Sequence, residues 1–227
     1  KLLSTSAGIS NNEIYQIACL SEFIKPRNIL IIGNSYGISA MFLSLIFPKS
    51  NLVAIDKFRN EGINFTNSIL KKISKNKYAI SASSPEDIPS IAKKYFNDKI
   101  DLVLIDGLHT NEAQKIDFEA VYPYLTKNSL VILHDVINCN LIDSYEKICN
   151  KYKLQSYLFT KSTSGMALIF RDKVKNDIFK NYLDYFSDGI DKVIALNKIL
   201  KQYDGEKKLK GISKTKYKLK KPKHPQK

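Results

Sequence analysis

Five short apolar runs, each followed by a segment of helical pattern, constrain the fold of this 227-residue chain more than any other feature. The runs are four or five residues long and rich in branched aliphatic residues, which is typical of strands buried on both faces of a sheet. They span residues 28–32, 52–55, 78–81, 101–105 and 130–133. Helices are expected over residues 10–23, 38–47, 65–73, 84–95, 111–122 and 141–151. Strands and helices in this alternation form a parallel sheet with helices on both faces.

The C-terminal third of the chain departs from the alternation. Residues 153–159 and 166–171 read as two strands with Ser, Thr and Gly between them and no helix, which predicts a closing antiparallel hairpin. Residues 173–203 are expected to be helical with a break at Gly189, and residues 204–227 to form a disordered Lys-rich tail. The sequence therefore predicts one α/β domain over residues 1–203, a Rossmann-like doubly wound sheet of five parallel strands plus the hairpin.

Charge and cysteine content limit the class of protein. The net charge is +14, but residues 207–227 hold ten lysines and no acid, so the rest of the chain carries only +4. Cys19, Cys139 and Cys149 form no CxxC pair, which argues against a disulfide framework or a structural zinc site and favours a reducing, cytoplasmic location. There is no sign of a secretory signal, and no apolar run approaches the roughly 18–20 residues that a membrane span needs. The tail fits either a solvated segment or one that contacts an anionic partner.

Polar residues at the ends of the first three strands suggest a nucleoside-containing ligand. In parallel sheets, ligands bind at the carboxyl ends of the strands. Gly33 and Gly37 frame a turn after the first strand, where glycine lets the backbone approach a ligand. Asp56 ends the second strand, 23 residues after Gly33, where a carboxylate can accept hydrogen bonds from ribose hydroxyls. Ser83 could lie near an adenine edge, whereas Ser84, followed by proline, is interpreted as a helix cap.

The fourth and fifth strands end in a more informative group. Asp106 and His109 follow the fourth strand, and His134 and Asp135 follow the fifth. A histidine can act as a general base near neutral pH, and two carboxylates at adjacent strand ends can bind a divalent cation. Such a cation could hold a substrate hydroxyl and lower its pKa. The alternative, in which both histidines only cap helices or support neighbouring groups, stays open at this point.

Several of these segments resemble one enzyme family. IIGNSYGISAMFL, AIDKF and SSPEDIP resemble motifs of the class I S-adenosylmethionine (SAM)-dependent methyltransferases. DLVLIDGLHTNEAQKIDFEAVYPYL followed by LVILHDV resembles the subgroup with an IDGxH…HDV signature, which includes small-molecule O-methyltransferases. Some relatives in this group methylate sugar hydroxyls with a bound magnesium ion. The resemblance covers roughly residues 5–171, and the IDGxH…HDV pair is its most specific part.

The resemblance implies a role for each strand-end residue. The methionine part of SAM would be lined by Gly33, Asn34, Ser35 and Gly37. Asp56 would bind the ribose, and Asp106 would lie beside the sulfonium and serve as a metal ligand. His109 would be the general base for the accepting hydroxyl, and Asp135 a second metal ligand.

The sequence also departs from the family pattern at four positions. Ile31 stands where the first strand usually has an acid, Ser35 where the loop has its middle glycine, and Ser83 where an acid often follows the third strand. Metal-dependent relatives often have two adjacent acids after the fifth strand, and here the first of them is His134. His134 as an additional metal ligand, and Mg²⁺ or another divalent cation as a cofactor, therefore remain open.

The resemblance implies a SAM-dependent methyltransferase that acts on a hydroxyl of a small molecule or glycan. The helices of residues 173–203 would cover the acceptor site or mediate a homodimer. A non-catalytic or RNA-directed protein with the same fold is a second interpretation, motivated by the basic tail. An NAD-dependent oxidoreductase is a third, disfavoured because the chain has neither a full GxGxxG motif nor a clear second domain.

Overall fold

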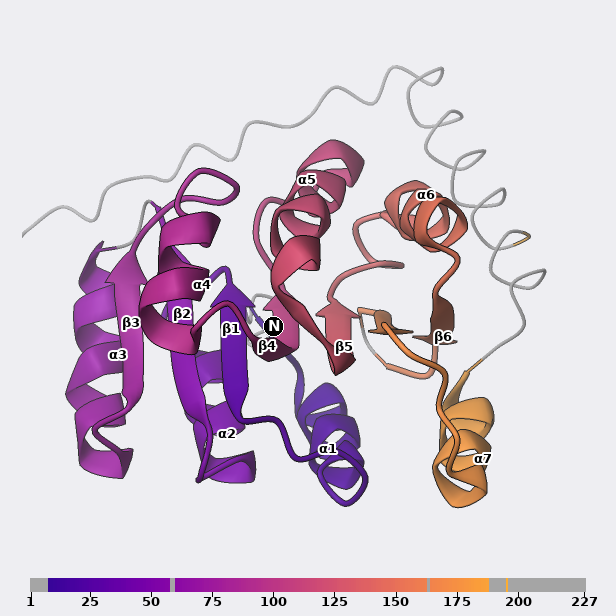
Figure 1. Ribbon diagram of the computed structural model, residues 1–227, viewed down its shortest axis with the longest axis horizontal. Helices are drawn as coiled ribbons and strands as arrows, with labels where there is room; N and C mark the ends of the chain where they lie inside the picture. Colours follow the sequence, from indigo (N-terminus) through magenta and orange to yellow (C-terminus); the bar gives the residue numbers. More distant parts are fainter. Residues whose placement is uncertain (1–7, 58–59, 163, 188–194, 196–227) are drawn as a thin grey trace, which may run out of the picture. The chain divides into compact units, whose positions relative to one another are not determined.

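A seven-stranded sheet forms the centre of the molecule in the computed structural model, which describes residues 8–57, 60–162, 164–187 and 195 (Figure 1). The strand order is β3-β2-β1-β4-β5-β7-β6. The strands are β1 (Asn28–Ile32), β2 (Asn51–Asp56), β3 (Lys77–Ser81), β4 (Ile100–Ile105), β5 (Leu125–Leu133), β6 (Gln155–Phe159) and β7 (Met166–Phe170). Neighbouring strands from β3 to β5 pair in parallel, while β7 is antiparallel to both β5 and β6. The predicted fold class and the closing hairpin are confirmed.

Helices cover both faces of this sheet, as the alternation predicted. Figure 1 shows α1, α2, α3 and α7 on one face and α4, α5 and α6 on the other. The helices are α1 (Asn11–Leu20), α2 (Ile38–Ile46), α3 (Asn60–Ile73), α4 (Ile88–Phe96), α5 (Asn111–Val121), α6 (Ile142–Tyr152) and α7 (Asp177–Phe186). A short 3-10 helix, Tyr122–Tyr124, joins α5 to β5. The core of the first face consists of buried aliphatic and aromatic side chains of the strands and of α1, α2, α3 and α7.

The strands end close to the positions predicted from the sequence. The prediction succeeded because the buried residues of the strands are the apolar ones that the sequence shows as runs. β1 buries four consecutive residues, and β2 buries four before it ends at Asp56. β5 is the exception, since it begins five residues earlier than predicted. Its first half is partly exposed and polar, and it is held through the pairing of Leu125 with Ile100, so composition could not identify it.

The start of α1 was predicted correctly from the local sequence, whereas the start of α4 was not. The capping box of Ser10 and Glu13 forms as predicted, with the Ser10 hydroxyl accepting the Glu13 N–H and the Glu13 carboxylate accepting the Ser10 N–H. Ser84 is not a helix cap, and that prediction was wrong. The helix starts at Ile88 with Asp87 at its N-cap, because residues 84–87 form a turn. The Ser83 N–H donates to the Asp87 carboxylate at 2.8 Å, which fixes that turn.

Within the predicted helical segment 173–203, the first helix begins later than predicted. It starts at Asp177 because the Asn176 side chain caps it, accepting the Phe179 N–H. It ends at Phe186, and the predicted break at Gly189, nearly all of the further helix and the tail of residues 204–227 lie outside the described residues. All of these elements belong to the first of two units, Lys1–Ile190; in the second, Asp191–Lys227, only Ala195 is described. Within the described residues, no helix combines the length and apolar character of a membrane span.

Candidate functional site

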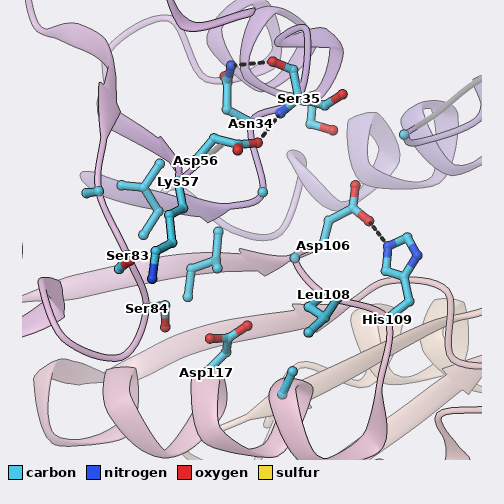
Figure 2. Close-up of a pocket in the computed structure, with 18 of the residues that line it drawn as sticks. Asn34, Ser35, Asp56, Lys57, Ser83, Ser84, Asp106, Leu108, His109 and Asp117 are labelled. Atoms are coloured by element: carbon cyan, nitrogen blue, oxygen red, sulfur yellow. Dashed lines mark hydrogen bonds and ion pairs between the residues drawn. The ribbon is translucent and has the colours of Figure 1, made fainter. Parts of the chain in front are cut away.

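A cavity of about 640 Å³ opens at the carboxyl ends of β1, β2 and β4 and beside the loop after β3 (Figure 2). Its volume lies within the range typical of small-molecule sites. The structure brings most of the residues predicted for the site to its wall: Gly33, Asn34, Ser35, Asp56, Ser83, Asp106 and His109. Gly37, His134 and Asp135 are not among the lining residues. Ile31 is completely buried in β1 and does not line the cavity.

Gly33 holds the backbone of β1 against that of β4. Its φ is +100°, a conformation that residues with a side chain rarely adopt. A Cβ at this position would lie 2.0 Å from the Asp106 carbonyl oxygen. Only glycine therefore allows the first turn and the start of the Asp106 loop to approach so closely.

Gly37 serves packing rather than the cavity wall. Its φ is +80°, and a Cβ there would lie 2.0 Å from the Thr66 hydroxyl oxygen on α3. The Thr66 hydroxyl also accepts a hydrogen bond from the Asn34 side-chain amide at 3.0 Å. The second half of the turn is thus fixed against α3, while Gly33, Asn34 and Ser35 border the cavity.

The turn also orients the Asp56 carboxylate. The Ser35 N–H donates to Asp56 Oδ2 at 2.8 Å, which links the first turn to the end of β2. In the described part of the chain, Asn34 Oδ1 and Ser35 Oγ are buried without a hydrogen-bond partner. Buried polar atoms are nearly always paired, so two unpaired ones on a cavity wall are suited to a polar ligand.

A buried chain of charged groups lies behind the opposite wall. The His134 ring stands between two carboxylates, with Nδ1 2.9 Å from Asp106 Oδ1 and Nε2 3.1 Å from Glu13 Oε2. Glu13 lies on α1 and is completely buried; it also accepts the Ser164 N–H at 3.2 Å. Because a carboxylate only accepts hydrogen bonds, both ring nitrogens of His134 donate, and the ring is an imidazolium.

The pKa values of this pair follow from the same contacts. Burial favours the neutral ring of His134, but its hydrogen bonds to Asp106, Asp135 and Glu13 prevail and raise its pKa to about 12. Burial likewise opposes the charge on Glu13, yet the hydrogen bond and charge of His134, with the bonds from Ser10, lower the Glu13 pKa to about 2. A fixed positive charge is therefore held beside Asp106 at neutral pH.

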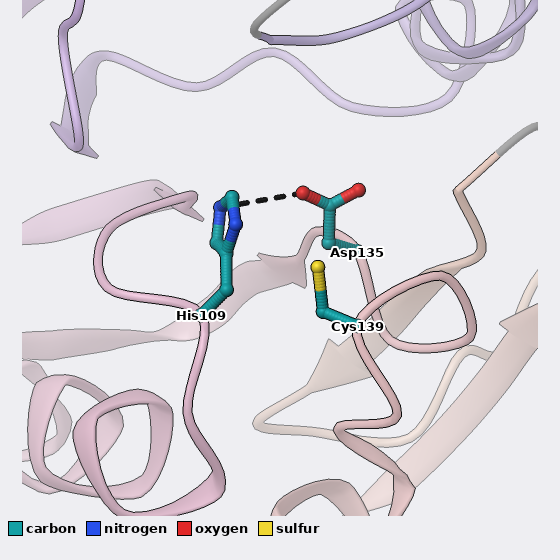
Figure 3. A group of neighbouring side chains, drawn as sticks. All are labelled: His109, Asp135 and Cys139. Atoms are coloured by element: carbon teal, nitrogen blue, oxygen red, sulfur yellow. Dashed lines mark ion pairs between the residues drawn. The ribbon is translucent and has the colours of Figure 1, made fainter. Parts of the chain in front are cut away.

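His109 bridges the two carboxylates that follow β4 and β5. Its Nε2 lies 3.4 Å from Asp106 Oδ1 and 3.3 Å from Asp135 Oδ2, and its side chain is 43% exposed (Figures 2 and 3). The hydrogen bond to Asp106 raises the pKa of His109, with burial opposing and the charge of Asp135 adding to the rise. A proton on Nε2 is favoured by both carboxylates, which leaves Nδ1 of the neutral ring as the proton acceptor.

Among the described residues, two overlapping groups of side chains offer ligand atoms for a metal ion. Asp106, His134 and Asp135 form one, and His109, Asp135 and Cys139 form the other (Figure 3). His134 has no lone pair to offer while both of its nitrogens donate to carboxylates. Asp106 and Asp135 remain as oxygen ligands, a number with which Mg²⁺ can be bound when water and substrate complete its shell.

Sequence reasoning missed two residues of this region. Glu13 was interpreted only as part of a capping box, and that local pattern explained it completely. Asp117 on α5 is 6% exposed and lines the cavity, but nothing in the local sequence distinguishes it from a surface acid. Only the packing of α1 and α5 against the sheet reveals both roles.

Comparison with known proteins reveals similarity to methyltransferases. Residues 30–136 match a family described as "Methyltransferase domain". The chain is 26% identical over 160 residues to "Ribosomal RNA small subunit methyltransferase G" of Malacoplasma penetrans, an alignment that covers 67% of this chain. The chain spans 64% of the length of that relative.

Solved structures share the fold at low sequence identity. An O-methyltransferase from Bacillus cereus in complex with SAH has a TM-score of 0.61 and 15% identity, covering 73% of this chain and 83% of that one. The O-methyltransferase TomG from Streptomyces achromogenes, in complex with SAM, has a TM-score of 0.61 and 15% identity over 74% and 82% of the two chains. A methyltransferase from Geobacter sulfurreducens has a TM-score of 0.60 and 13% identity over 73% and 80%.

Proposed function

We propose that this chain, in which residues 30–136 form a SAM-dependent methyltransferase domain, transfers the methyl group of SAM to a hydroxyl oxygen of a small molecule or glycan. The observation that carries the proposal is that one cavity is bordered by the glycine turn, by Asp56 and by the Asp106–His109 pair. The first two suit an amino acid and a ribose, and the third suits a reacting hydroxyl. The O-methyltransferases among the structural neighbours support oxygen as the accepting atom.

The charge of the buried cluster supports a cationic ligand. With their carboxyls ionised, Glu13, Asp106 and Asp135 contribute three negative charges, and His134 compensates one of them. While His109 is neutral, the cluster is left with a net charge of about −2 in a partly desolvated setting, where electrostatic attraction is strong. A sulfonium ion beside Asp106 would be stabilised there.

The chain's own groups account for the remaining steps. SAM supplies a methyl group activated by a positively charged sulfur. His109 takes the proton of the accepting hydroxyl on Nδ1, and Asp106 and Asp135 stabilise the imidazolium that results. Asp56 and the glycine turn fix the donor, so that the acceptor needs only to be aligned behind the methyl group.

A divalent cation fits this arrangement through Asp106 and Asp135. When bound, it would lower the pKa of the accepting hydroxyl and so reduce the demand on His109. The donor set of two carboxylates favours Mg²⁺ over softer metals. Turnover should then fall on removal of metal with EDTA and return with added Mg²⁺, whereas turnover that is unaffected by EDTA would assign the proton transfer to His109 alone.

Binding and turnover have to be measured separately to test the proposal. Calorimetry should show micromolar binding of SAM and SAH to the wild-type chain, with no comparable binding of NADH. His109→Ala should retain SAH binding, while turnover falls by roughly 10²–10⁴-fold, the usual contribution of a general base. SAH release is the readout, with catechols, free sugars and glycosides as acceptors. An active His109→Ala variant would disprove the assignment of the base.

RNA as the acceptor is the second candidate, supported by the similarity to a ribosomal RNA methyltransferase and by the ten lysines of residues 207–227. Clustered lysines neutralise phosphates, so RNA binding would weaken steeply with salt. A chain that ends at residue 204 should then lose salt-dependent binding to RNA. Equal binding before and after truncation, or none at all, would remove RNA from consideration.

The oligomeric state is a separate question for the same domain. A homodimer mediated by residues 173–203 remains a prediction, as does a cytoplasmic location. Size-exclusion chromatography with light scattering, on the full chain and on one ending at residue 187, would test the dimer.

A further inference from the structure

Asp117 is a buried carboxyl group in the cavity that the proposed reaction leaves without a role. It projects from α5 into the cavity, on the side opposite Asp56 (Figure 2). It is only 6% exposed. Within the described residues it forms no salt bridge, and burial raises its pKa to about 6. A buried acid without a basic partner is costly, so a carboxyl at a cavity wall is better explained by a ligand than by stability.

The surroundings of Asp117 are built around its carboxyl. A Cβ added to Gly107 would lie 3.2 Å from Asp117 Oδ2, so glycine at that position lets the carboxyl lie directly against the loop that follows β4. The hydroxyl oxygen of Ser84 is buried and, within the described residues, has no hydrogen-bond partner of normal geometry. It lies close enough to the Asp117 carboxyl to oppose part of the rise in the pKa of that group. Since the helix begins at Ile88 rather than at Ser84, this hydroxyl is not consumed by a cap.

The order of the strands decides which part of a ligand reaches this pair. The turn after β1 and Asp106 after β4 flank the middle of the sheet, and Asp56 lies at the end of the neighbouring β2. A nucleoside with its ribose at Asp56 and its 5′ substituent at the β1 turn directs its base toward the loop after β3 and toward α5. Ser83, Ser84 and Asp117 line that end of the cavity.

We infer that Asp117 and Ser84 read the base of the bound nucleoside: Asp117 accepts a hydrogen bond from the exocyclic amine of adenine, and the Ser84 hydroxyl donates to a ring nitrogen. The inference rests on the proposed function, because it presupposes an adenosyl ligand. It makes Asp117 a specificity-determining residue. A base with a carbonyl in place of the exocyclic amine would place its carbonyl oxygen against the Asp117 carboxylate, and the two would repel each other. A site built to bond a donor rejects an analogue that lacks it, because its own buried groups are then left unpaired.

The first comparison needs no variant. Calorimetry on the wild-type chain would compare SAH with S-inosylhomocysteine, in which the exocyclic amine is replaced by a carbonyl. We expect SAH to bind roughly 10- to 100-fold more tightly, the range typical of a hydrogen bond to a charged group. Equal affinities would overturn the inference and leave the proposed function intact, whereas no binding of SAH would overturn both.

The decisive variant is Asp117→Asn, which keeps the shape of the side chain and adds an N–H donor. The preference for SAH should fall to roughly threefold or less, or reverse, because the amide can donate to the carbonyl of hypoxanthine. Asp117→Ala should bring the two affinities together without reversal. Asp98→Asn, at an exposed aspartate after α4, is the matched control and should keep the wild-type ratio. An Asp117→Asn protein that binds SAH with an unchanged preference would refute the assignment.

Discussion

The buried Glu13–His134 pair allows the sharpest prediction about how this fold is stabilised. Glu13 on α1 accepts hydrogen bonds from the Ser10 N–H and hydroxyl, from His134 Nε2 and from the Ser164 N–H. All four neighbours are donors. In Glu13→Gln, one oxygen would be replaced by an NH₂ group that faces donors, and His134 would lose one of its two carboxylate partners.

The size of the effect follows from the pKa of Glu13. Its lowering from 4.5 to about 2 corresponds to about 3 kcal/mol of folding free energy at pH 6. Removal of one partner of a buried pair typically costs about 3–5 kcal/mol, which agrees with this value. For a chain of this size, a loss of about 3 kcal/mol should lower the midpoint of thermal unfolding by roughly 6–12 °C.

The pH dependence of this stabilisation has a definite sign. The folded-state pKa of Glu13 is below its unfolded value of 4.5, so the stabilisation is complete above pH 4.5 and is lost as the pH falls toward 2. The folded-state pKa of His134 is raised from 6.5 to about 12, so its share is complete below pH 6.5 and decreases as the pH rises toward 12. These are two descriptions of one interaction, which contributes most between pH 4.5 and 6.5.

Urea unfolding at pH 6 is the appropriate assay. Far-ultraviolet circular dichroism is the probe, because the chain has no tryptophan. Glu22→Gln, at an exposed residue just after α1, is the matched control and should stay within about 0.5 kcal/mol of wild type. A double-mutant cycle of Glu13→Gln with His134→Gln should give a coupling of roughly 1.5–3 kcal/mol. A Glu13→Gln protein within about 1 kcal/mol of wild type, or a coupling near zero, would refute the reasoning.

Other predictions concern the cavity itself. Gly33→Ala should destabilise the fold by roughly 2–4 kcal/mol, because it adds a backbone clash to a positive φ. Gly8→Ala, at φ +118° with nothing within 4 Å of the added methyl, should cost about 1–2 kcal/mol, and equal urea midpoints would disprove the clash. Asp56→Ala should weaken SAH binding by roughly 10- to 100-fold in calorimetry. Unchanged binding would contradict the assignment of the ribose to Asp56. For an acceptor turned over without metal, kcat/KM should fall as the pH decreases through a pKa above 6.5, because Asp106 favours protonated His109. A flat profile between pH 6 and 9 would contradict His109 as the base.

Local sequence patterns were sufficient to predict the architecture. A strand buried on both faces must be apolar and continuous, so the runs at residues 28–32 and 101–105 were visible, and the interruption by glycine or aspartate marked their ends. Because carboxyl ends of parallel strands meet at one edge, the gathering of Asp56, Asp106 and His109 around one cavity also followed from local patterns.

Contacts between distant parts of the chain could not be predicted from local patterns. Glu13 and His134 are 121 residues apart, and their pairing depends on α1 packing beside the end of β5. The capping box of Ser10 and Glu13 forms whether or not Glu13 contacts His134. The capping pattern in the sequence therefore could not predict that contact. Asp117 and Ser84 come together only because α5 and the loop after β3 border the same cavity. Helix and strand patterns in a sequence indicate only that a residue is buried or exposed. A charge pair or a contact to a base depends on which side chain from a distant part of the chain packs beside that residue.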